Sequence, residues 1–186
     1  MKQFLKAIHA VDDAILDEYI SCWEEFSVKR KTIITAEDQV QRHMFFVREG
    51  IQKSYYIDDG KEHVIAFTYP PSFSGIPDSF LPQKPSKYFL ETITDSKFLR
   101  LSYRMHQEMM ARYRPKETLF RIATEMVLIG LIQRHHELMA FDIETRFKTM
   151  MQRSPHLLNM IPHKDLASYL RINPTNFSKL LSSVTI

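Results

Sequence analysis

The sequence predicts an α+β protein in which an antiparallel β-roll is followed by a long helix and a helical tail. Short runs of β-forming residues fill the chain to about Tyr103, a helical repeat of apolar residues follows Pro115, and short helical segments occupy the last part. With 186 residues, 44% of them hydrophobic, the chain is long enough to bury a core. We expect a roll over residues 1–114, a helix over 115–141 and a tail over 142–186.

The N-terminal segment has the apolar spacing of an amphipathic helix. Apolar residues recur every three or four positions from Gln3 to about Glu24, so we predict one helix there. Asp12 and Asp13 interrupt the apolar stretch that a signal peptide would need, and no stretch resembles a membrane helix of roughly 20 apolar residues. Because Cys22 is the single cysteine, an intrachain disulfide and an iron–sulfur site are excluded. We expect a cytoplasmic protein without a membrane span or a cofactor.

The β-forming region is divided by turn residues at close intervals. Asp58-Asp59-Gly60-Lys61 is typical of a hairpin turn, in which Gly60 supplies a positive φ. Prolines and glycine between Pro70 and Pro85 indicate a loop at the wall of a pocket, if the roll has one. Many short strands without long helices between them predict an antiparallel roll or barrel. The expected strands include Thr32–Ile34, Met44–Val47, Ser54–Ile57, His63–Phe67, Phe89–Ile93 and Phe98–Leu101.

The helix after Pro115 carries a stripe of residues at spacings of three and four. Proline is tolerated in the first turn of a helix, so the helix can begin there. This stripe could pack on the core of its own chain or against the same helix of a second copy. We favour the second interpretation because the stripe continues past any obvious intramolecular partner. The predicted dimer interface is Leu119, Ile122, Met126, Ile129 and Gln133, and His136 continues the same spacing.

The most informative segment of the tail is IPHKDLASYLRINPTNFSKLL, residues 161–181. Two short helices are joined by Arg171-Ile172-Asn173, and the small residue Ala167 lets them cross closely. Asn173 can cap the second helix. Polar side chains on that helix would face outward and fit the major groove of DNA, although an ordinary helical hairpin is the alternative. The predicted DNA-binding residues are Thr175, Asn176, Ser178, Lys179, Lys164 and Ser182.

Charge is distributed unevenly between the tail and the rest of the chain. Residues 142–186 carry six basic and three acidic side chains, which accounts for the whole net charge of +3. A basic tail on a neutral body is typical of a DNA-binding appendage, but chance placement would give the same count. Lys179 is the only basic residue on the second helix. Only Ser182 to Ile186 follow that helix, so we expect no β-hairpin wing, and DNA affinity would require a dimer.

This tail segment resembles the helix-turn-helix of Crp/Fnr-type regulators, particularly the compact form found in Bacteroidetes-like bacteria. The similarity extends to FFVREGIQKSYYIDDGKEHVIAF, which resembles the family's glycine-centred strand pair with Gly50 as the glycine, to FTYPPSFSG and to FLETITDSKFLRLSYRMHQEM. The resemblance implies a cyclic-nucleotide-binding-like, double-stranded β-helix domain, a dimerisation helix and a helix-turn-helix domain. It implies double-stranded DNA with a palindromic operator, a homodimer and RNA polymerase as partners.

The resemblance also identifies the position of a candidate effector pocket. Family members that bind cyclic AMP carry a Gly-Glu pair and, a few residues on, an Arg-Ser or Arg-Thr pair. Here Gly75 is followed by Ile76, and Ser86 followed by Lys87 stands at the arginine position. An unpaired buried phosphate is costly, so we expect no cyclic AMP binding. The pocket, formed by Phe73, Gly75, Ile76, Ser86 and Lys87, would bind another small effector or be filled by its own side chains.

No motif in the sequence indicates an enzyme. A nucleophile elbow, a phosphate-binding loop and a zinc-protease motif are all absent from the sequence. His43, His63 and His106 leave a haem ligand formally open, and His135 and His136 point about 100° apart on a helix, which favours solvated side chains over a metal site. The competing function is a small-ligand-binding or protein-interaction β-roll with a vestigial DNA-binding tail.

Overall fold

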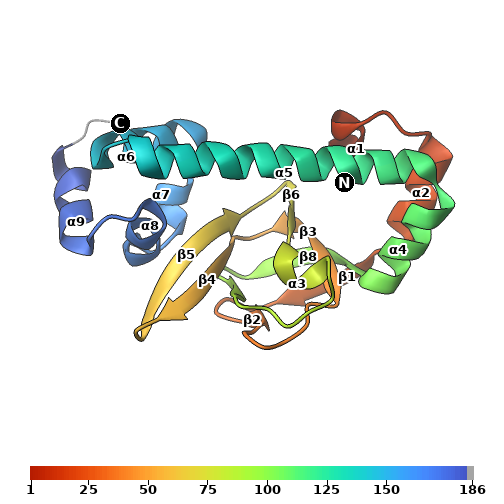
Figure 1. Ribbon diagram of the computed structural model, residues 1–186, viewed down its shortest axis with the longest axis horizontal. Helices are drawn as coiled ribbons and strands as arrows, with labels where there is room; N and C mark the ends of the chain where they lie inside the picture. The colour runs from red at the N-terminus through yellow and green to blue at the C-terminus, as the bar shows by residue number, and fades with distance from the viewer. Residues whose placement is uncertain (184–186) are drawn as a thin grey trace.

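The computed structural model describes residues 1–183 as a β-roll with a long helix across it (Figure 1). Helix α5 extends from the N-terminal helices at one end to a small helical unit at the other. The elements are α1 (Lys2–Ile8), α2 (Asp13–Ser21), β1 (Glu24–Val28), β2 (Ile33–Thr35), β3 (His43–Glu49), β4 (Gln52–Asp58), β5 (Lys61–Thr68), β6 (Ser72–Ser74), α3 (Pro77–Phe80), β7 (Phe89–Thr92), β8 (Ser96–Ser102), α4 (Tyr103–Arg112), α5 (Arg114–Ala140), α6 (Ile143–Arg153), α7 (Leu157–Met160), α8 (His163–Leu170) and α9 (Pro174–Ser183).

The predicted antiparallel roll is confirmed. Two four-stranded sheets have the strand orders β1-β8-β3-β6 and β2-β7-β4-β5, and every pairing is antiparallel. Alternating apolar residues of both sheets meet in one core. Its buried members are Phe45, Val47, Ile76, Leu90 and Phe98.

Two glycines have backbone conformations that the roll requires. Asp59 and Gly60 both have positive φ, of 48° and 70°, which gives the tight turn predicted between β4 and β5. Gly50 has a φ of 90° between β3 and β4, and a Cβ there would lie 2.5 Å from the carbonyl oxygen of Asp95. A side chain at position 50 would therefore collide with the turn between β7 and β8.

The prediction of one helix from Gln3 to Glu24 is wrong. The chain leaves α1 at His9, and Asp12 starts a second helix by accepting a hydrogen bond from the Ala14 N–H at 2.9 Å. The segment then enters β1 at Glu24, at the start of the predicted β-forming region but before the first strand that was expected there. The short strand β6 and helix α3 also lie inside the predicted proline-rich loop, after a cis peptide bond between Pro70 and Pro71.

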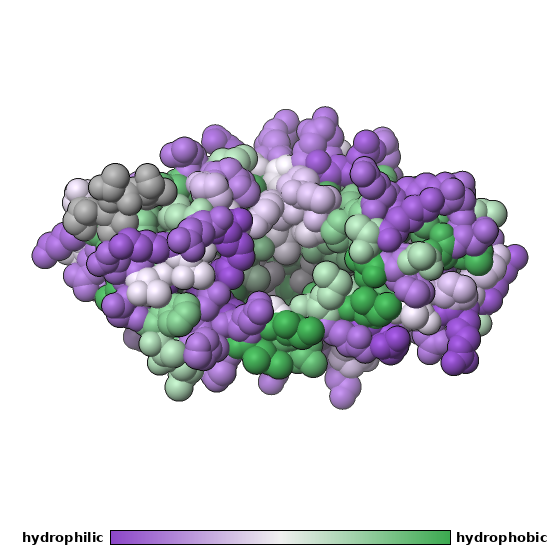
Figure 2. All heavy atoms as spheres, turned by 90° about the horizontal axis from the view of Figure 1, so that it is seen from above, coloured by the Kyte–Doolittle hydropathy of each residue, from purple (hydrophilic) through white to green (hydrophobic). Residues whose placement is uncertain are grey.

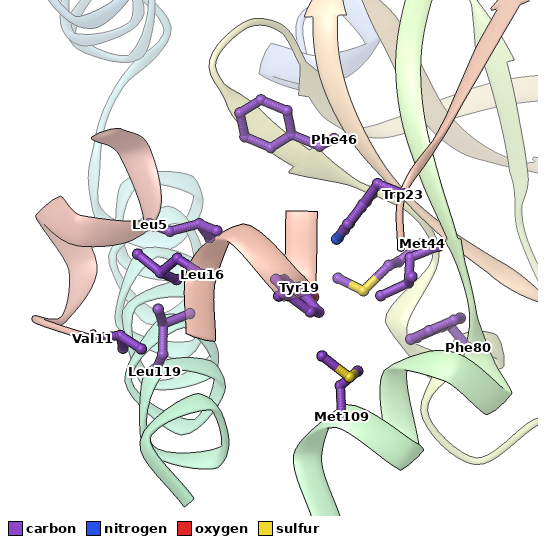
Figure 3. Close-up of a cluster of buried hydrophobic side chains, with 11 residues drawn as sticks. Leu5, Val11, Leu16, Tyr19, Trp23, Met44, Phe46, Phe80, Met109 and Leu119 are labelled. Atoms are coloured by element: carbon purple, nitrogen blue, oxygen red, sulfur yellow. The ribbon is translucent and has the colours of Figure 1, made fainter. Parts of the chain in front are cut away.

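A hydrophobic cluster joins the N-terminal helices to α4 and α5. Leu5 and Leu16 lie close to Leu119 of α5 (Figure 3), and Tyr19 and Trp23 extend the cluster toward the roll. The residues of the predicted N-terminal helix thus form a core together with α4 and α5, which lie about 100 residues later in the chain.

The tail packs around a core to which the roll contributes Ile51. Phe147, Met150 and Met151 of α6 pack against apolar residues of α8 and α9, among them Leu166, Ala167, Leu170, Ile172 and Phe177. The expectation of a missing wing concerns residues 184–186, which lie outside the described residues. Within residues 1–183, no helix combines the length and the apolar character needed to cross a bilayer.

Candidate nucleic-acid interface and effector site

The turn between α8 and α9 is fixed by backbone geometry and by one cap. Arg171 adopts the left-handed conformation with a φ of 57°, and the Ile172 N–H donates to the Ala167 carbonyl at 2.9 Å. Asn173 then accepts a hydrogen bond from the Thr175 N–H at 2.9 Å, as predicted for a cap. Ala167 is fully buried, which allows the two helices to approach closely.

The outward face of α9 is polar and exposed. The five predicted residues on it, Thr175, Asn176, Ser178, Lys179 and Ser182, are all exposed. Ser178 and Ser182 donate hydrogen bonds to carbonyls of their own helix, the first to Pro174 at 3.1 Å. The side chains of Thr175, Asn176 and Lys179 have no hydrogen bond or ion pair with any described residue. Three polar side chains on this face are thus available to an external partner.

Helix α8 closes the free edge of one sheet of the roll. Strand β5 is the edge strand of its sheet. The Ser168 hydroxyl accepts a hydrogen bond from the Val64 N–H at 2.9 Å and donates to the Glu62 carbonyl at 3.1 Å. A single side chain therefore satisfies two backbone groups that an unpaired edge would leave to solvent.

A buried lysine strengthens this docking. Lys53 of β4 is 5% exposed at its side chain, and its Nζ lies 2.5 Å from Glu62, 3.5 Å from Asp165 of α8 and 3.9 Å from Glu91. Burial lowers the pKa of Lys53, but the hydrogen bond to Glu62 and the nearby carboxylates outweigh it, so the pKa lies above its usual value. The lysine remains charged and bridges the roll and the tail.

The end of α5 is fastened to the tail by a second ion-pair group. Glu137 is 7% exposed and binds Arg153 of α6 at 2.9 Å and Arg134 at 3.3 Å. Arg134 also lies 4.0 Å over the ring of Tyr169 and donates to the carbonyl of that residue. Movement of this end of α5 would therefore be transmitted to α8.

Upstream of this ion-pair group, α5 carries a bare hydrophobic stretch. Six large apolar residues are each between 55% and 61% exposed: Met126, Val127, Leu128, Ile129, Leu131 and Ile132. At about 100° per residue they surround the helix, and a helix apolar on every side is normally buried. Figure 2 shows hydrophobic side chains gathered in the middle of the molecule, between more hydrophilic ends.

The predicted dimer stripe is divided between two environments. Leu119 is 2% exposed and packs in the cluster with the N-terminal helices, so its place in a dimer interface is corrected. Ile122 is half-buried, whereas Met126, Ile129 and Gln133 are exposed. Periodicity gave no sign of this change, because it does not report which partner covers a residue.

At the candidate effector site, a glutamine occupies the space beside Gly75. Gln41 is 3% exposed, and its Oε1 accepts hydrogen bonds from the Ile76 N–H at 2.8 Å and from Thr35 at 3.3 Å. Its Nε2 donates to the His43 carbonyl at 2.9 Å. Gly75 has a φ of 156°, and a Cβ on it would lie 2.4 Å from Gln41 Nε2. Gln41 thus takes the space beside Gly75, and no local sequence pattern marked it because the contact joins distant positions.

The five predicted pocket residues do not converge. Ser86 is 1% exposed and its hydroxyl exchanges hydrogen bonds with the backbone of Tyr88, while Lys87 is exposed. Ile76 is buried in the core of the roll. Phe73 instead packs in the N-terminal cluster, with ring centroids 5.7 Å from Phe4 and 5.6 Å from Phe120, which corrects its assignment to the pocket. Aromatic contacts with residues of α1 and α5 hold this side chain in the N-terminal cluster.

The histidines are dispersed. Burial lowers the pKa of His106 to about 4, so this residue is neutral at pH 7. His63 Nδ1 lies 3.2 Å from Arg171 Nη1, and His135 and His136 are exposed on α5. In the described part of the chain, no three His, Cys, Asp or Glu residues are grouped as they would be to hold a metal ion.

Comparison with known proteins gives one family and several similar structures. The family model described as a cyclic nucleotide-binding domain matches residues 25–122. FixK2 from Bradyrhizobium japonicum has a TM-score of 0.73 and 18% identity, covering 86% of this chain and 83% of that one. A protein described as a Crp/Fnr-family transcriptional regulator, from Eubacterium rectale, has a TM-score of 0.71 and 12% identity, covering 92% and 82%.

The catabolite activator protein of Thermus thermophilus has a TM-score of 0.60 and 16% identity, covering 95% of this chain and 84% of that one. A search of curated proteins gives no match. At these identities the structural similarities establish the fold.

Proposed function

Because the chain belongs to the cyclic nucleotide-binding domain family, we propose that it is a dimeric Crp/Fnr-type transcription regulator that reads DNA through α8 and α9. The observation that carries this proposal is the outward face of α9. Its apolar face closes the tail core through Phe177, and Thr175, Asn176 and Lys179 are exposed without partners among the described residues. A short helix presented in this way fits the major groove, where Asn pairs with adenine and Lys with guanine or phosphate.

Dimerisation through α5 supports the same function. The bare stretch from Met126 to Ile132 needs a cover, and the same helix of a second copy supplies one with two-fold symmetry. Two α9 helices related by that symmetry would read a palindromic operator. In this arrangement residues 1–114 form the roll, 115–141 the dimer helix and 142–186 the DNA-binding domain.

The roll in this proposal does not bind cyclic AMP. Gln41 fills the space beside Gly75, and Lys84 and Lys87, the two lysines that follow Gly75 in the proline-rich loop, are both exposed. Opening the site would break the hydrogen bonds of Gln41 and leave the phosphate without a buried cation. We expect titration with cyclic AMP to give no heat in calorimetry; a micromolar binding isotherm would contradict this part of the proposal. In the proposal, the signal that the roll receives is another small effector or a protein.

The chain in this proposal is a cytoplasmic regulator of the compact form, without catalytic activity, and RNA polymerase is a further partner. The assignment of α9 as the DNA-reading helix is tested by measuring affinity for a duplex that the protein selects from random DNA sequences. We expect Lys179→Ala to weaken binding several-fold and Lys179→Glu nearly to abolish it, because charge reversal repels phosphate. Lys87→Glu, at an exposed position of the roll, serves as the control.

Fluorescence anisotropy measures each variant's affinity for the selected duplex. Unchanged affinity in both Lys179 variants would refute the assignment of α9. Failure to select any sequence would favour a ligand-binding or protein-interaction roll with a vestigial tail.

A further inference from the structure

Buried polar groups without partners are concentrated in one part of the molecule. Among the described residues, five buried side-chain atoms lack a hydrogen bond. Four of them lie in or against the cluster that joins the N-terminal helices to α4 and α5: the Tyr19 hydroxyl, Trp23 Nε1, His106 Nδ1 and Lys116 Nζ. Each of these side chains is 7% exposed or less. Native proteins leave few such groups, so four in one cluster require an explanation.

Three of the four groups are gathered around the ring of Tyr19. Lys116 Nζ lies 4.2 Å from the centroid of that ring, and the ring of Trp23 is nearly perpendicular to it at 5.7 Å. Burial raises the pKa of Tyr19 and the Trp23 indole opposes this rise, so the indole is close to the hydroxyl. The Trp23 nitrogen points toward Tyr19 in Figure 3. His106 instead packs 4.4 Å from the ring of Phe120.

The surroundings of Lys116 do not compensate its charge. Glu18 is the carboxylate that acts on its pKa, but one oxygen of Glu18 binds Arg112 at 2.7 Å and the other binds the Tyr113 hydroxyl at 2.5 Å. Arg112 and the Cys22 thiol are the other titratable groups that affect it. Burial dominates and lowers the pKa of Lys116 to about 8.

The position of Lys116 in α5 suits a negative group better than a positive one. Lys116 is in the first turn of a helix of 27 residues, where the helix dipole is positive. An ammonium is disfavoured at that end, whereas a carboxylate is stabilised there. The neighbouring donors, the engaged Glu18 and the positive helix end therefore all favour an anionic group on this nitrogen.

Lys116 is reached only through apolar packing. Its side chain is 1% exposed, and Leu5 and Leu16 of the N-terminal helices lie close to Leu119 on α5 (Figure 3). A hydrated anion would have to lose its water to pass, which is costly. Carbon dioxide is small and uncharged, so it crosses such packing, and it reacts with unprotonated primary amines. A buried lysine with a lowered pKa provides that amine near neutral pH.

We propose that Lys116 is a carboxylation site for carbon dioxide, and that Tyr19 and Trp23 bind the carbamate that forms. The Nζ lone pair makes the new N–C bond as one C–O π bond opens to an anionic oxygen, and Nζ then loses one proton to solvent. One amine and one carbon dioxide thus give one carbamate and one proton, without an oxidant or a reductant. The Tyr19 O–H and the Trp23 Nε1–H donate to the carbamate oxygens.

Carboxylation would act on α5 at the end opposite to the tail. The modified Lys116 would bind α2 through Tyr19 and the start of the roll through Trp23, which ties three segments together. Carbon dioxide would then be the small effector of the proposed regulator. This regulatory role rests on the proposed function, in which α5 carries the dimer interface, whereas the chemical modification of Lys116 does not.

Trapping of the carbamate tests the modification directly. The full-length protein is equilibrated at about pH 8, the pKa of Lys116, in buffer sparged with nitrogen or with carbon dioxide. Triethyloxonium then converts any carbamate to a stable ethyl ester, which mass spectrometry of the digest assigns to a residue. Two lysines of the same digest are internal controls: Lys53, which is buried but paired with carboxylates, and Lys87, which is exposed.

We expect the trapped fraction on Lys116 under carbon dioxide to exceed that on Lys87 at least about tenfold. At that pH the unprotonated fraction of Lys116 is larger than that of an ordinary lysine on the order of a hundredfold. Lys53 should carry no product, since its carboxylates keep it protonated. Thermal unfolding of the wild type should shift upward under carbon dioxide, because the carbamate forms in the folded state, and Lys116→Met should show no shift.

Two variants test the donors. Tyr19→Phe and Trp23→Phe each remove one donor and keep an aromatic ring, and we expect a several-fold lower trapped fraction on Lys116 in each, with Lys87 unchanged. Tyr19→Phe in nitrogen-sparged buffer should unfold at the wild-type temperature or above it, because the hydroxyl that it removes has no partner. This measurement shows that the variant is folded.

The outcomes separate this inference from the proposed function. Equal trapped fractions on Lys116 and Lys87 would overturn the inference, as would a wild-type fraction in both donor variants. A thermal shift that nitrate reproduces, without a trapped product, would mean that a bound anion takes the place of the carbamate. A trapped carbamate with equal operator affinity in both gases would leave the modification and remove its regulatory role. Unchanged DNA affinity in Lys179→Glu would count against the proposed function alone.

Discussion

The two halves of α5 differ both in composition and in environment. In the first half, Lys116 and Leu119 are 1% and 2% exposed beneath the N-terminal helices, whereas from Met126 to Ile132 large apolar side chains are more than half exposed. The helix is continuous across both halves. Removing apolar area from water stabilises either half equally per unit area, so the bare half requires a cover that the first half obtains from its own chain. The difference teaches that one part of a helix can belong to the core of its own chain while another part is left for an interface with a partner.

The largest effect on assembly should come from a charged side chain in the exposed stretch of α5, from Met126 to Ile132. Ile129→Asp would place a carboxylate where a second helix packs, and burying an unpaired charge there is prohibitive. We expect monomers in analytical ultracentrifugation. Ile57→Asp is the matched control, since Ile57 is 49% and Ile129 56% exposed. A wild-type sedimentation profile for Ile129→Asp would move the interface elsewhere.

Truncation in the covered half should reduce stability and leave assembly intact. Leu119→Ala removes a side chain that is 2% exposed, and we expect a loss of about 2–5 kcal/mol in the free energy of unfolding. Urea denaturation measures the loss, and ultracentrifugation at the same concentration should still show dimers. Dissociation without destabilisation would mean that Leu119 faces a second copy after all.

The covered half also contains an unfavourable charge. Lys116 Nζ has no hydrogen-bond partner among the described residues and lies 4.2 Å over the ring of Tyr19. Burial lowers the pKa of Lys116 to about 8. We expect Lys116→Met to raise the free energy of unfolding at pH 7 by about 2 kcal/mol. The methionine side chain has nearly the same volume as the lysine side chain, but it carries no charge that must be buried.

The sign of the pH dependence follows from that pKa. Between pH 8 and the ordinary lysine pKa of 10.5, the unfolded chain binds the proton that the folded chain has released, so wild-type stability rises with pH through this window. Thermal unfolding from pH 7 to 10.5 should show this rise in the wild type and not in Lys116→Met. Parallel pH profiles would show that Lys116 keeps its proton in the fold.

The smallest effect on stability should come from the contact between α8 of the tail, which follows the exposed half of α5, and strand β5. Ser168→Ala removes two hydrogen bonds to the edge of β5, and we expect a loss of about 1 kcal/mol. Hydrogen exchange should accelerate at the Val64 amide, which loses its acceptor. Ser178→Ala, whose hydroxyl bonds within α9, is the control; equal exchange in wild type and Ser168→Ala would indicate that α8 does not dock on β5 in solution.

Much of the fold was predictable because it depends on neighbours in sequence. The hairpin at Gly60, the helix after Pro115 and the cap at Asn173 follow from local conformational preferences, and the structure contains each of them. The single N-terminal helix was predicted wrongly, since Asp12 begins a second helix by capping it. The strand β1 lies in the predicted β-forming region, but its short run of alternating residues was not recognised as a strand.

The sequence by itself determined the roll, the long helix and the polar outward face of α9, because alternation, helical spacing and turn residues act over a few positions. Tertiary structure alone decided which side chain meets which. Gln41 fills the space beside Gly75, Phe73 packs in the N-terminal cluster, and Ser168 of α8 bonds to β5, because each contact joins segments that are distant in the chain. Residues on one stripe of α5 look alike in sequence, and only packing separates those that the chain covers itself from those it leaves for a partner.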